Sequence, residues 1–165
     1  MKLFIAEKPS MARELAKCLP QPQQRKNGYI VTGGGIVTWA YGHVLQQAEP
    51  QDYDPKYKQW REEDLPIIPK QWKLLVSPNS KDQFDLICRL IKKADIIVNA
   101  GDPDREGQLL IDEILEYVGN TKPVERILLN ALDEKSIRES LQHLRNNRDF
   151  CHLKDSALVR SRADW

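Results

Sequence analysis

The sequence predicts an α/β protein in which a mostly parallel β-sheet is covered by helices on both faces and carries one inserted β-hairpin. Short apolar runs typical of buried strands alternate along the chain with segments whose apolar residues recur at helical spacing. This alternation favours a parallel sheet, because each helix carries the chain back to the start of the next strand. A run of glycines interrupts the alternation once and accounts for the hairpin.

The first elements follow from apolar spacing and from the positions of proline. Residues 2–6 form an apolar run that predicts a buried strand. Pro9 suits the first turn of a helix, where its missing N–H would have no partner in any case. The apolar residues that follow share one helical face: Ala12, Leu15, Ala16 and Leu19. Pro20 then ends this helix.

The next segment is predicted to be a hairpin followed by an irregular connection. Residues 28–32 and 36–41 are rich in β-forming residues, and the glycines at 33–35 separate them as a turn. Residues 46–70 are aromatic, contain several prolines and show no clear period, so they are predicted to be a long irregular segment.

The second half of the chain continues the alternation. Three more strands are predicted at 72–76, 95–99 and 125–129. Three helical faces lie between or after them: Phe84, Ile87, Cys88 and Ile91; Ile111, Ile114, Leu115 and Val118; Ile137, Leu141 and Leu144. Residues 153–165 again show a helical pattern.

The composition excludes several classes of protein. The chain has 165 residues, of which 41% are hydrophobic, and its formal net charge is +1, so it is too apolar and too balanced to be disordered. No apolar run approaches the ~20 residues that cross a bilayer, so no membrane partner is expected. The cysteines Cys18, Cys88 and Cys151 are odd in number and lack paired spacing, which argues against a disulfide scaffold or a structural zinc site and favours a reducing cytosol.

The small net charge hides a separation of charge along the chain. Residues 8–26 hold five basic residues and one acid, which gives +4, whereas residues 102–116 hold six acids and one base, which gives −5. A near-neutral protein is a poor candidate for binding nucleic acid by bulk charge alone. The basic segment is therefore either a solvated surface or a local edge that faces DNA.

Acidic residues follow two of the predicted strands. Glu7 comes directly after the first strand, and Asp102, Asp104 and Glu106 follow the strand at 95–99. Ligands of such sheets bind outside the carboxyl ends of the strands, so these carboxylates are candidates for one site. Oxygen ligands in this arrangement suit Mg²⁺, which keeps several waters for itself and for a phosphate group. The competing interpretation is that these acids only serve a turn and the first turn of a helix.

The sequence around these acids resembles a known family. A strand, Glu and helix, followed later by a strand, Asp-x-Asp-x-Glu and helix, is similar to the Toprim domain of topoisomerases, bacterial primases and some nucleases. Glu7-Lys-Pro-Ser10 and Ala100-Gly-Asp-Pro-Asp-Arg-Glu-Gly-Gln108 resemble the type IA DNA topoisomerases, of the topoisomerase III kind. Residues 39–45 and 160–165 also resemble that subfamily, so the resemblance covers essentially the whole chain.

The resemblance implies a Rossmann-like Toprim domain over residues 1–152 and, over 153–165, the start of a helix that leads into a further topoisomerase domain. It also implies an enzyme that cuts one DNA strand with a tyrosine, passes another strand through and reseals the cut, to relax or decatenate DNA. None of Tyr29, Tyr41, Tyr53, Tyr57 and Tyr117 stands in a context that resembles the family's nucleophile. The chain by itself is therefore expected to be inactive in cleavage.

The resemblance also assigns roles at the acidic site. Glu7, Asp102 and Asp104 match the family's Mg²⁺ ligands, and Glu106 is expected to assist a second ion or the acid network. Glu7 is further expected to transfer a proton at the scissile phosphate, and Lys8 to stabilise the charge of that phosphate. All five are candidate catalytic residues.

The remaining implications concern partners and alternatives. Lys8, Arg105, Arg160 and Arg162 are candidate contacts to single-stranded DNA at the scissile phosphate, and the other domains of a longer chain are the expected protein partners. The expected location is the bacterial cytoplasm, in association with the nucleoid. Two other functions stay open: a Toprim nuclease or primase-like nucleotidyl transferase, and a binding module whose acids hold a regulatory ion.

Overall fold

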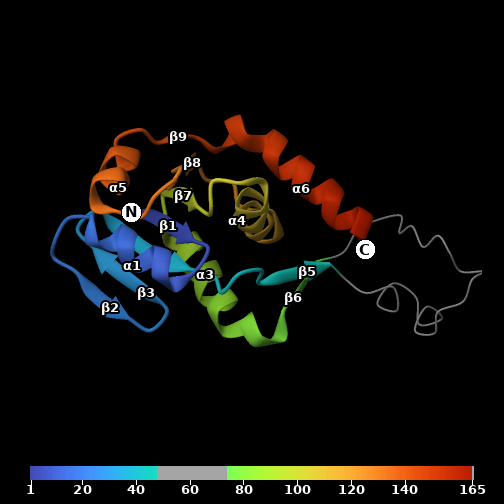
Figure 1. Cartoon of the computed structure of the whole chain (residues 1–165). Coiled ribbons are helices and arrows are strands. Elements are labelled where there is room, and N and C mark those ends of the chain that lie inside the picture. The colour runs from blue at the N-terminus through green and yellow to red at the C-terminus, as the bar shows by residue number, and fades with distance from the viewer. Residues whose placement is uncertain (48–73, 165) are drawn as a thin grey trace, which may run out of the picture.

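We describe the protein from a computed structural model, in which residues 1–47 and 74–164 are placed (Figure 1). The described strands are β1 (Lys2–Ala6), β2 (Gln24–Lys26), β3 (Tyr29–Thr32), β4 (Gly35–Trp39), β5 (Leu45–Gln47), β6 (Leu74–Val76), β7 (Ile96–Ala100), β8 (Val124–Arg126) and β9 (Arg145–Asn146). The described helices are α1 (Pro9–Lys17), α3 (Lys81–Lys93), α4 (Arg105–Tyr117), α5 (Glu134–Leu141) and α6 (Cys151–Asp164), with the short 3₁₀ helices η3 (Pro78–Ser80) and η4 (Asn147–Phe150).

The central feature is a seven-stranded sheet with the order β2-β3-β4-β1-β7-β8-β9. Its four middle strands, β4, β1, β7 and β8, are parallel to one another. The strands at the two sides, β2, β3 and β9, are antiparallel to their neighbours. The sheet thus has a parallel centre with antiparallel edges, and β5 and β6 form a separate antiparallel pair.

Strand β1 divides the core into two layers. Leu3 and Ile5 point to one face of the sheet and belong to the apolar cluster that includes residues of α3 and α4. Phe4 and Ala6 point to the opposite face and join residues of α1 and α5. Successive side chains of a strand alternate between faces, so a strand that is apolar throughout must be covered on both sides. The prediction of a mostly parallel sheet with helices on both faces is confirmed (Figure 1).

The predicted hairpin is also confirmed, with a tighter turn than expected. Strands β3 and β4 pair in antiparallel register with Thr32 opposite Gly35, so Gly33 and Gly34 alone form the turn. Gly35 has φ +136°, and a Cβ at this position would collide with the backbone of Lys2 in β1. The glycine therefore allows β4 to pair closely with β1.

Three strands, β2, β5 and β9, were not predicted, and some boundaries differ. The side chains of β2 are all exposed, and β9 has two exposed residues, so neither shows apolar alternation. The strand predicted at 125–129 is limited to Val124–Arg126, and α4 begins at Arg105, before its first apolar marker. Most of the segment 46–70, with Tyr53, Tyr57 and its other aromatic residues, lies outside the described residues.

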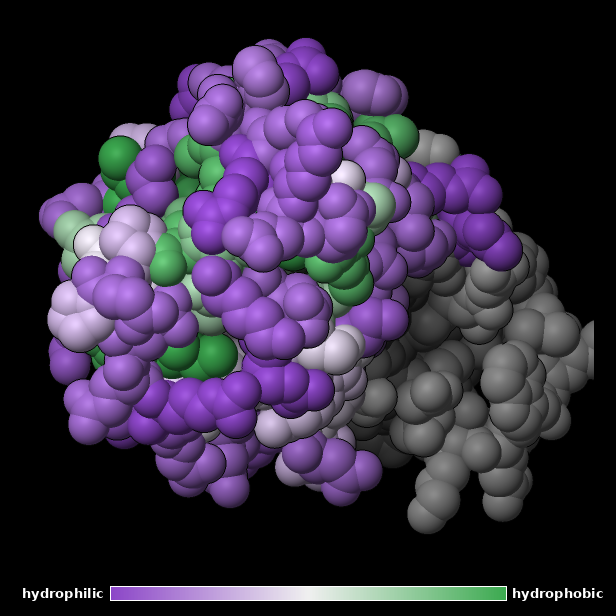
Figure 2. All heavy atoms as spheres, turned by 60° about the vertical axis from the view of Figure 1, so that its left-hand side comes forward, coloured by the Kyte–Doolittle hydropathy of each residue, from purple (hydrophilic) through white to green (hydrophobic). Residues whose placement is uncertain are grey.

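The apolar residues are largely internal. On the face that Figure 2 brings forward, hydrophilic side chains dominate and apolar ones form small separate areas. Within residues 1–47 and 74–164, no helix has both the length and the apolar character that a membrane crossing requires.

Candidate metal centre

The sheet brings the two acidic segments together. Strands β1 and β7 are parallel neighbours, and Ala6 lies opposite Ala100 at their carboxyl ends. Glu7 follows directly after β1, and Gly101 and Asp102 follow directly after β7. We call residues 101–104 the acidic loop. Two segments almost a hundred residues apart in the sequence thus leave the sheet side by side, as the strand-end rule predicts.

Glu7 and Asp102 are in direct contact. Burial raises the pKa of the Glu7 carboxyl to about 7, and a side-chain hydrogen bond with Asp102 and the charges of Asp102 and Asp104 act in the same direction. The Asp102 backbone N–H opposes this shift by donating to Glu7. Because neighbouring carboxylates repel each other when both are ionised, a cation bound between them would favour the ionised form of Glu7.

Asp104 has a second role at the start of α4. Its backbone is extended, with φ −138° and ψ 174°, and its Oδ1 accepts a hydrogen bond of 2.7 Å from the backbone N–H of Gly107. It is therefore the N-cap of the helix, and Glu106 lies in the first turn. Asp104 therefore caps the helix, as the competing interpretation of these acids expected, and its charge also raises the pKa of Glu7.

Two glycines allow the acidic loop to close on itself. A Cβ at Gly101 would collide with the carbonyl of Gly107, and a Cβ at Gly107 would collide with the backbone of Asp102. Neither glycine has a positive φ, so the reason for glycine here is close approach of backbone to backbone. The two glycines thus permit the tight path of this segment.

The other predicted site residues lie around or beyond this centre. Lys8 is exposed and immediately precedes α1, Arg105 is exposed at the first position of α4, and Glu106 beside it is half-buried. Both helices start at the edge of the sheet that carries the acids, so the positive ends of their dipoles face this edge. Arg160 and Arg162 are exposed on α6, which packs along α4 (Figure 1).

The sequence analysis missed the residue that lies under the acidic loop. Arg126 ends β8 and is fully buried, with 0% of its surface exposed. Its Nη1 donates to the carbonyls of Asn99 and Gly101, at 3.1 and 2.7 Å, and its Nη2 donates to the carbonyl of Asp102 at 2.6 Å. Its Nε donates to Gln108 Oε1 at 2.7 Å, and its Nη1 also donates to the carbonyl of Ile127 at 2.9 Å. One signal was available in the sequence, because Arg126 is a charged residue within a predicted strand and directly precedes the apolar run at 127–129.

A buried polar network continues from Arg126. Gln108 Nε2 donates to Asp112 Oδ2 at 2.9 Å and to Asn147 Oδ1 at 2.8 Å, and Asn147 Nδ2 donates to Asp112 Oδ1 at 2.7 Å. Asn99 Oδ1 accepts from the backbone N–H of Gly101 at 3.0 Å. The network therefore joins the acidic loop to β7, β8, α4 and η4.

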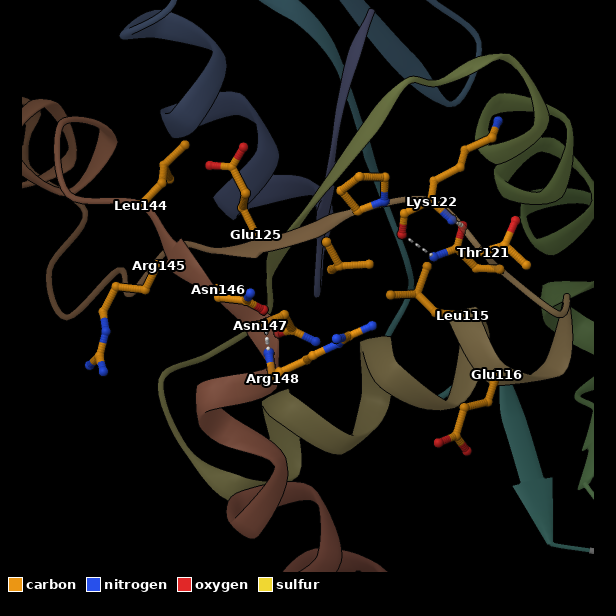
Figure 3. A pocket seen from close by; sticks show the side chains of 13 residues that line it. Leu115, Glu116, Thr121, Lys122, Glu125, Leu144, Arg145, Asn146, Asn147 and Arg148 are labelled. Atoms are coloured by element: carbon orange, nitrogen blue, oxygen red, sulfur yellow. Dashed lines mark hydrogen bonds between the residues drawn. The ribbon is translucent and has the colours of Figure 1, made fainter.

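A surface cavity of about 760 Å³ lies elsewhere (Figure 3). It is lined by the end of α4, the start of β8 and the segment 144–148. In Figure 3, Arg148 extends toward Leu115, whereas Arg145 points away. The cavity lies at the amino end of β8, and the acids lie at the carboxyl ends of β1 and β7, so it is separate from the candidate centre.

The chemistry of the acidic centre fits a divalent cation that binds together with a phosphate. Among residues 1–47 and 74–164, no group of three or more His, Cys, Asp or Glu side chains is arranged to hold a metal ion. Two carboxylates, Glu7 and Asp102, do converge, with Asp104 close enough to act on Glu7 by its charge. Mg²⁺ usually takes one or two protein carboxylates and completes its shell with water and substrate phosphate oxygens, so the donor set fits this ion.

The family of the chain follows from its sequence. Residues 2–132 match the Toprim domain family, and the chain belongs to that family.

More specific relatives are DNA topoisomerase 3 proteins. The chain is 49% identical to the protein of Pasteurella multocida and 50% identical to that of Haemophilus influenzae, each over 170 residues that cover 100% of this chain and 26% of the relative. It is 44% identical over 165 residues to the protein of Staphylococcus epidermidis, which covers 99% of this chain and 23% of the relative. The chain thus spans about a quarter of the length of these curated relatives.

A solved structure shows the same fold. The chain resembles full-length topoisomerase I from Thermotoga maritima with a TM-score of 0.57 and 18% identity, over 87% of this chain and 21% of that chain.

Proposed function

We propose that this chain is the Mg²⁺-binding Toprim part of a type IA DNA topoisomerase of the topoisomerase III kind, which cuts and reseals one DNA strand to relax or decatenate DNA. The observation that carries the proposal is the contact between Glu7 and Asp102 at the carboxyl edge of the sheet. The identity of 46–50% to several bacterial DNA topoisomerase 3 proteins supports the choice of reaction.

Glu7, Asp102 and Asp104 would hold the ion, with Glu106 assisting, and the bound ion would supply positive charge to the phosphate at which the strand is cut. Glu7 has a pKa of about 7, so it can hold or release a proton at its carboxylate near neutral pH. Lys8 stabilises the phosphate as a compact cation at the start of α1.

The rest of the reaction needs groups that we assign to a longer chain. We propose that a tyrosine elsewhere in that chain is the nucleophile, that residues 1–152 form the Toprim domain, and that 153–165 lead toward the following domain. Arg105, Arg160 and Arg162 would contact the single-stranded DNA beside the cut. The bacterial sources of the relatives and a DNA substrate together suggest a cytoplasmic, nucleoid-associated protein.

The proposal is tested on the natural full-length chain with supercoiled DNA. We expect Glu7→Gln and Asp102→Asn to lower the rate of Mg²⁺-dependent relaxation by a factor of roughly 100 or more, since each removes a charged group that acts on the reacting phosphate. Asp85→Asn is the matched control, because Asp85 is an exposed acid on α3, and its rate is expected to stay unchanged.

Two results would contradict the proposal. Relaxation that survives in both variants would exclude the acidic centre as the active site. Metal-dependent hydrolysis of DNA, or primer synthesis, without any covalent protein–DNA adduct would instead indicate a Toprim nuclease or a primase-like enzyme.

A further inference from the structure

Arg126 connects more parts of the candidate centre than any single acid does. Its guanidinium donates to the carbonyl of Asn99 in β7, to the carbonyls of Gly101 and Asp102 in the acidic loop, and to the Gln108 side chain in α4. These bonds join the end of β7, the acidic loop, β8 and α4 through one planar group. A guanidinium suits this task because its donors form a rigid fork.

Burial makes these contacts hard to replace. Arg126 is 0% exposed; its bonds to the carbonyls of Asn99 and Gly101 are buried, and its bond to the carbonyl of Asp102 is partly buried. If the guanidinium is removed, the carbonyls of Gly101 and Asp102 lose these donors, and we expect the acidic loop to move to regain hydrogen bonds. The other hydrogen bonds described for this segment are those from the backbone N–H of Gly101 to Asn99 Oδ1 and from the backbone N–H of Gly107 to Asp104 Oδ1.

The charge of Arg126 also matches its position. Burial lowers the pKa of its guanidinium to about 10, and the nearby charges of Asp112, Asp104, Asp102 and Glu7 oppose that shift. The group is therefore still a cation at neutral pH. It is a fixed positive charge below a cluster of acids whose mutual repulsion would otherwise open the loop.

We infer that Arg126 is the positioning residue of the candidate centre: it holds the backbone of the acidic loop so that the Asp102 carboxylate faces Glu7. Its partner Gln108 sets the orientation of the guanidinium, because Gln108 accepts from Nε while its own amide donates to Asp112 and Asn147. The consequence for metal binding rests on the function proposed above, whereas the effect on the loop does not.

The test compares Arg126→Lys with the natural residue in the full-length chain. Lysine keeps the positive charge but replaces the planar fork by one compact ammonium, which cannot reach four acceptors at once. The matched control is Ile137→Val or Ile137→Ala. Of these two, the variant whose melting temperature is closer to that of Arg126→Lys is used. Ile137 is fully buried in the cluster that includes residues of α1 and α5, and it is not one of the residues that bond to Arg126.

The first measurement is amide hydrogen exchange of the metal-free protein. In the natural protein the N–H of Gly101 donates to Asn99 Oδ1 and the N–H of Gly107 donates to Asp104 Oδ1. We expect Arg126→Lys to speed exchange at these two amides by a factor of roughly ten or more relative to the Ile137 control. Equal exchange in the two variants would overturn the inference.

The second measurement is the affinity for Mn²⁺, followed by electron paramagnetic resonance as a stand-in for Mg²⁺. We expect Arg126→Lys to weaken binding by roughly tenfold, as is usual when the groups that orient metal ligands are changed, and the control to leave it unchanged. Unchanged affinity in Arg126→Lys would overturn the role in metal binding. A natural protein that binds no Mn²⁺ would overturn the proposed function, and the exchange data would still decide whether Arg126 holds the loop.

A second variant covers the case in which Arg126→Lys does not fold. Gln108→Met removes the acceptor of Nε and leaves the three backbone carbonyls in place. Faster exchange at Gly101 and Gly107 is again expected, with a smaller factor than for Arg126→Lys. Exchange identical to that of the Ile137 control would count against the inference.

Discussion

At the scale of single residues, Glu7 shows how burial and charge together prepare a group for chemistry. Burial raises the pKa of its carboxyl to about 7, and the hydrogen bond with Asp102 and the charges of Asp102 and Asp104 act in the same direction. An ordinary surface glutamate is fully ionised at this pH. A cation that binds the Glu7 carboxylate would therefore compete with a proton near neutral pH.

This leads to a prediction about protons and metal. Below pH 7 the binding of a divalent ion must release the Glu7 proton, so we expect about one proton to be released per ion at pH 6 and nearly none at pH 8. The apparent affinity is therefore expected to rise as the pH approaches 7 and then to level off. Calorimetric titration with Mn²⁺ in buffers of different ionisation enthalpy measures this number.

The control for this prediction is Glu7→Gln, which has no proton to release at this position. The same release at pH 6 and pH 8 in the natural protein would contradict the assignment. The raised pKa of Glu7 also affects the stability of the metal-free protein. Protonation of Glu7 favours the folded state at low pH, and this contribution to the free energy of unfolding is lost as the pH rises toward 7.

Residues such as Glu7 and Asp102 could be predicted from the sequence because each follows an apolar strand directly. Arg126 could not be assigned a role in the same way. Its contacts are made to backbone carbonyls of another strand and loop, and no spacing in the sequence encodes the distance between β7 and β8. The sequence placed it within a predicted strand and did not indicate its partners.

At the scale of secondary structure, α4 combines a helix cap with the candidate centre. The Asp104 side chain both accepts from Gly107 and adds negative charge beside Glu7. Asp104→Asn keeps the cap and removes the charge, whereas Asp104→Ala removes both. The pair of variants therefore separates the role of Asp104 as a helix cap from the role of its charge at the candidate centre.

We expect Asp104→Ala to lower the free energy of unfolding by about 1 kcal/mol and Asp104→Asn to leave it nearly unchanged. Both variants are expected to weaken the response to Mg²⁺. Chemical denaturation gives the first quantity, and relaxation by the full-length chain at increasing Mg²⁺ gives the second. A normal Mg²⁺ response in Asp104→Asn would mean that Asp104 is only a cap.

The elements differ in how well the sequence predicts them. The strands β1 and β7 and the helices α1, α3 and α5 carry clear apolar patterns, and the hairpin has a glycine turn. The edge strands β2 and β9 have only exposed side chains, so their pairing depends on neighbours rather than on local pattern. The start of α4 at Arg105 is set by the Asp104 cap, four residues before the first buried leucine of the helix at Leu109.

At the scale of the whole molecule, the proposed metal binding would link the acidic centre to stability. An ion that binds only the folded state stabilises it by about 2.7 kcal/mol at a free concentration one hundred times its dissociation constant. We therefore expect Mg²⁺ to raise the melting temperature by several degrees, since about 2–4 °C corresponds to each kcal/mol in a protein of this size.

Differential scanning calorimetry with and without Mg²⁺, at equal ionic strength, measures this shift. Asp102→Asn is the control and is expected to lose most of it, because the variant lacks one of the two converging carboxylates. An equal rise in the variant and the natural protein would place the stabilising ion elsewhere.

The two borders of the seven-stranded sheet have a consequence for self-association. Unpaired strand edges recruit further strands and start aggregation unless charge or short length prevents it. Here one border is the three-residue β2, whose Arg25 and Lys26 are exposed, and the other is the two-residue β9 with exposed Arg145. Like charges would meet if two copies of β2 approached in antiparallel pairing, whereas Arg145 of β9 lies 3.7 Å from the Asp149 carboxylate. Short length at both borders and like charge at β2 are thus expected to hinder the addition of a further strand.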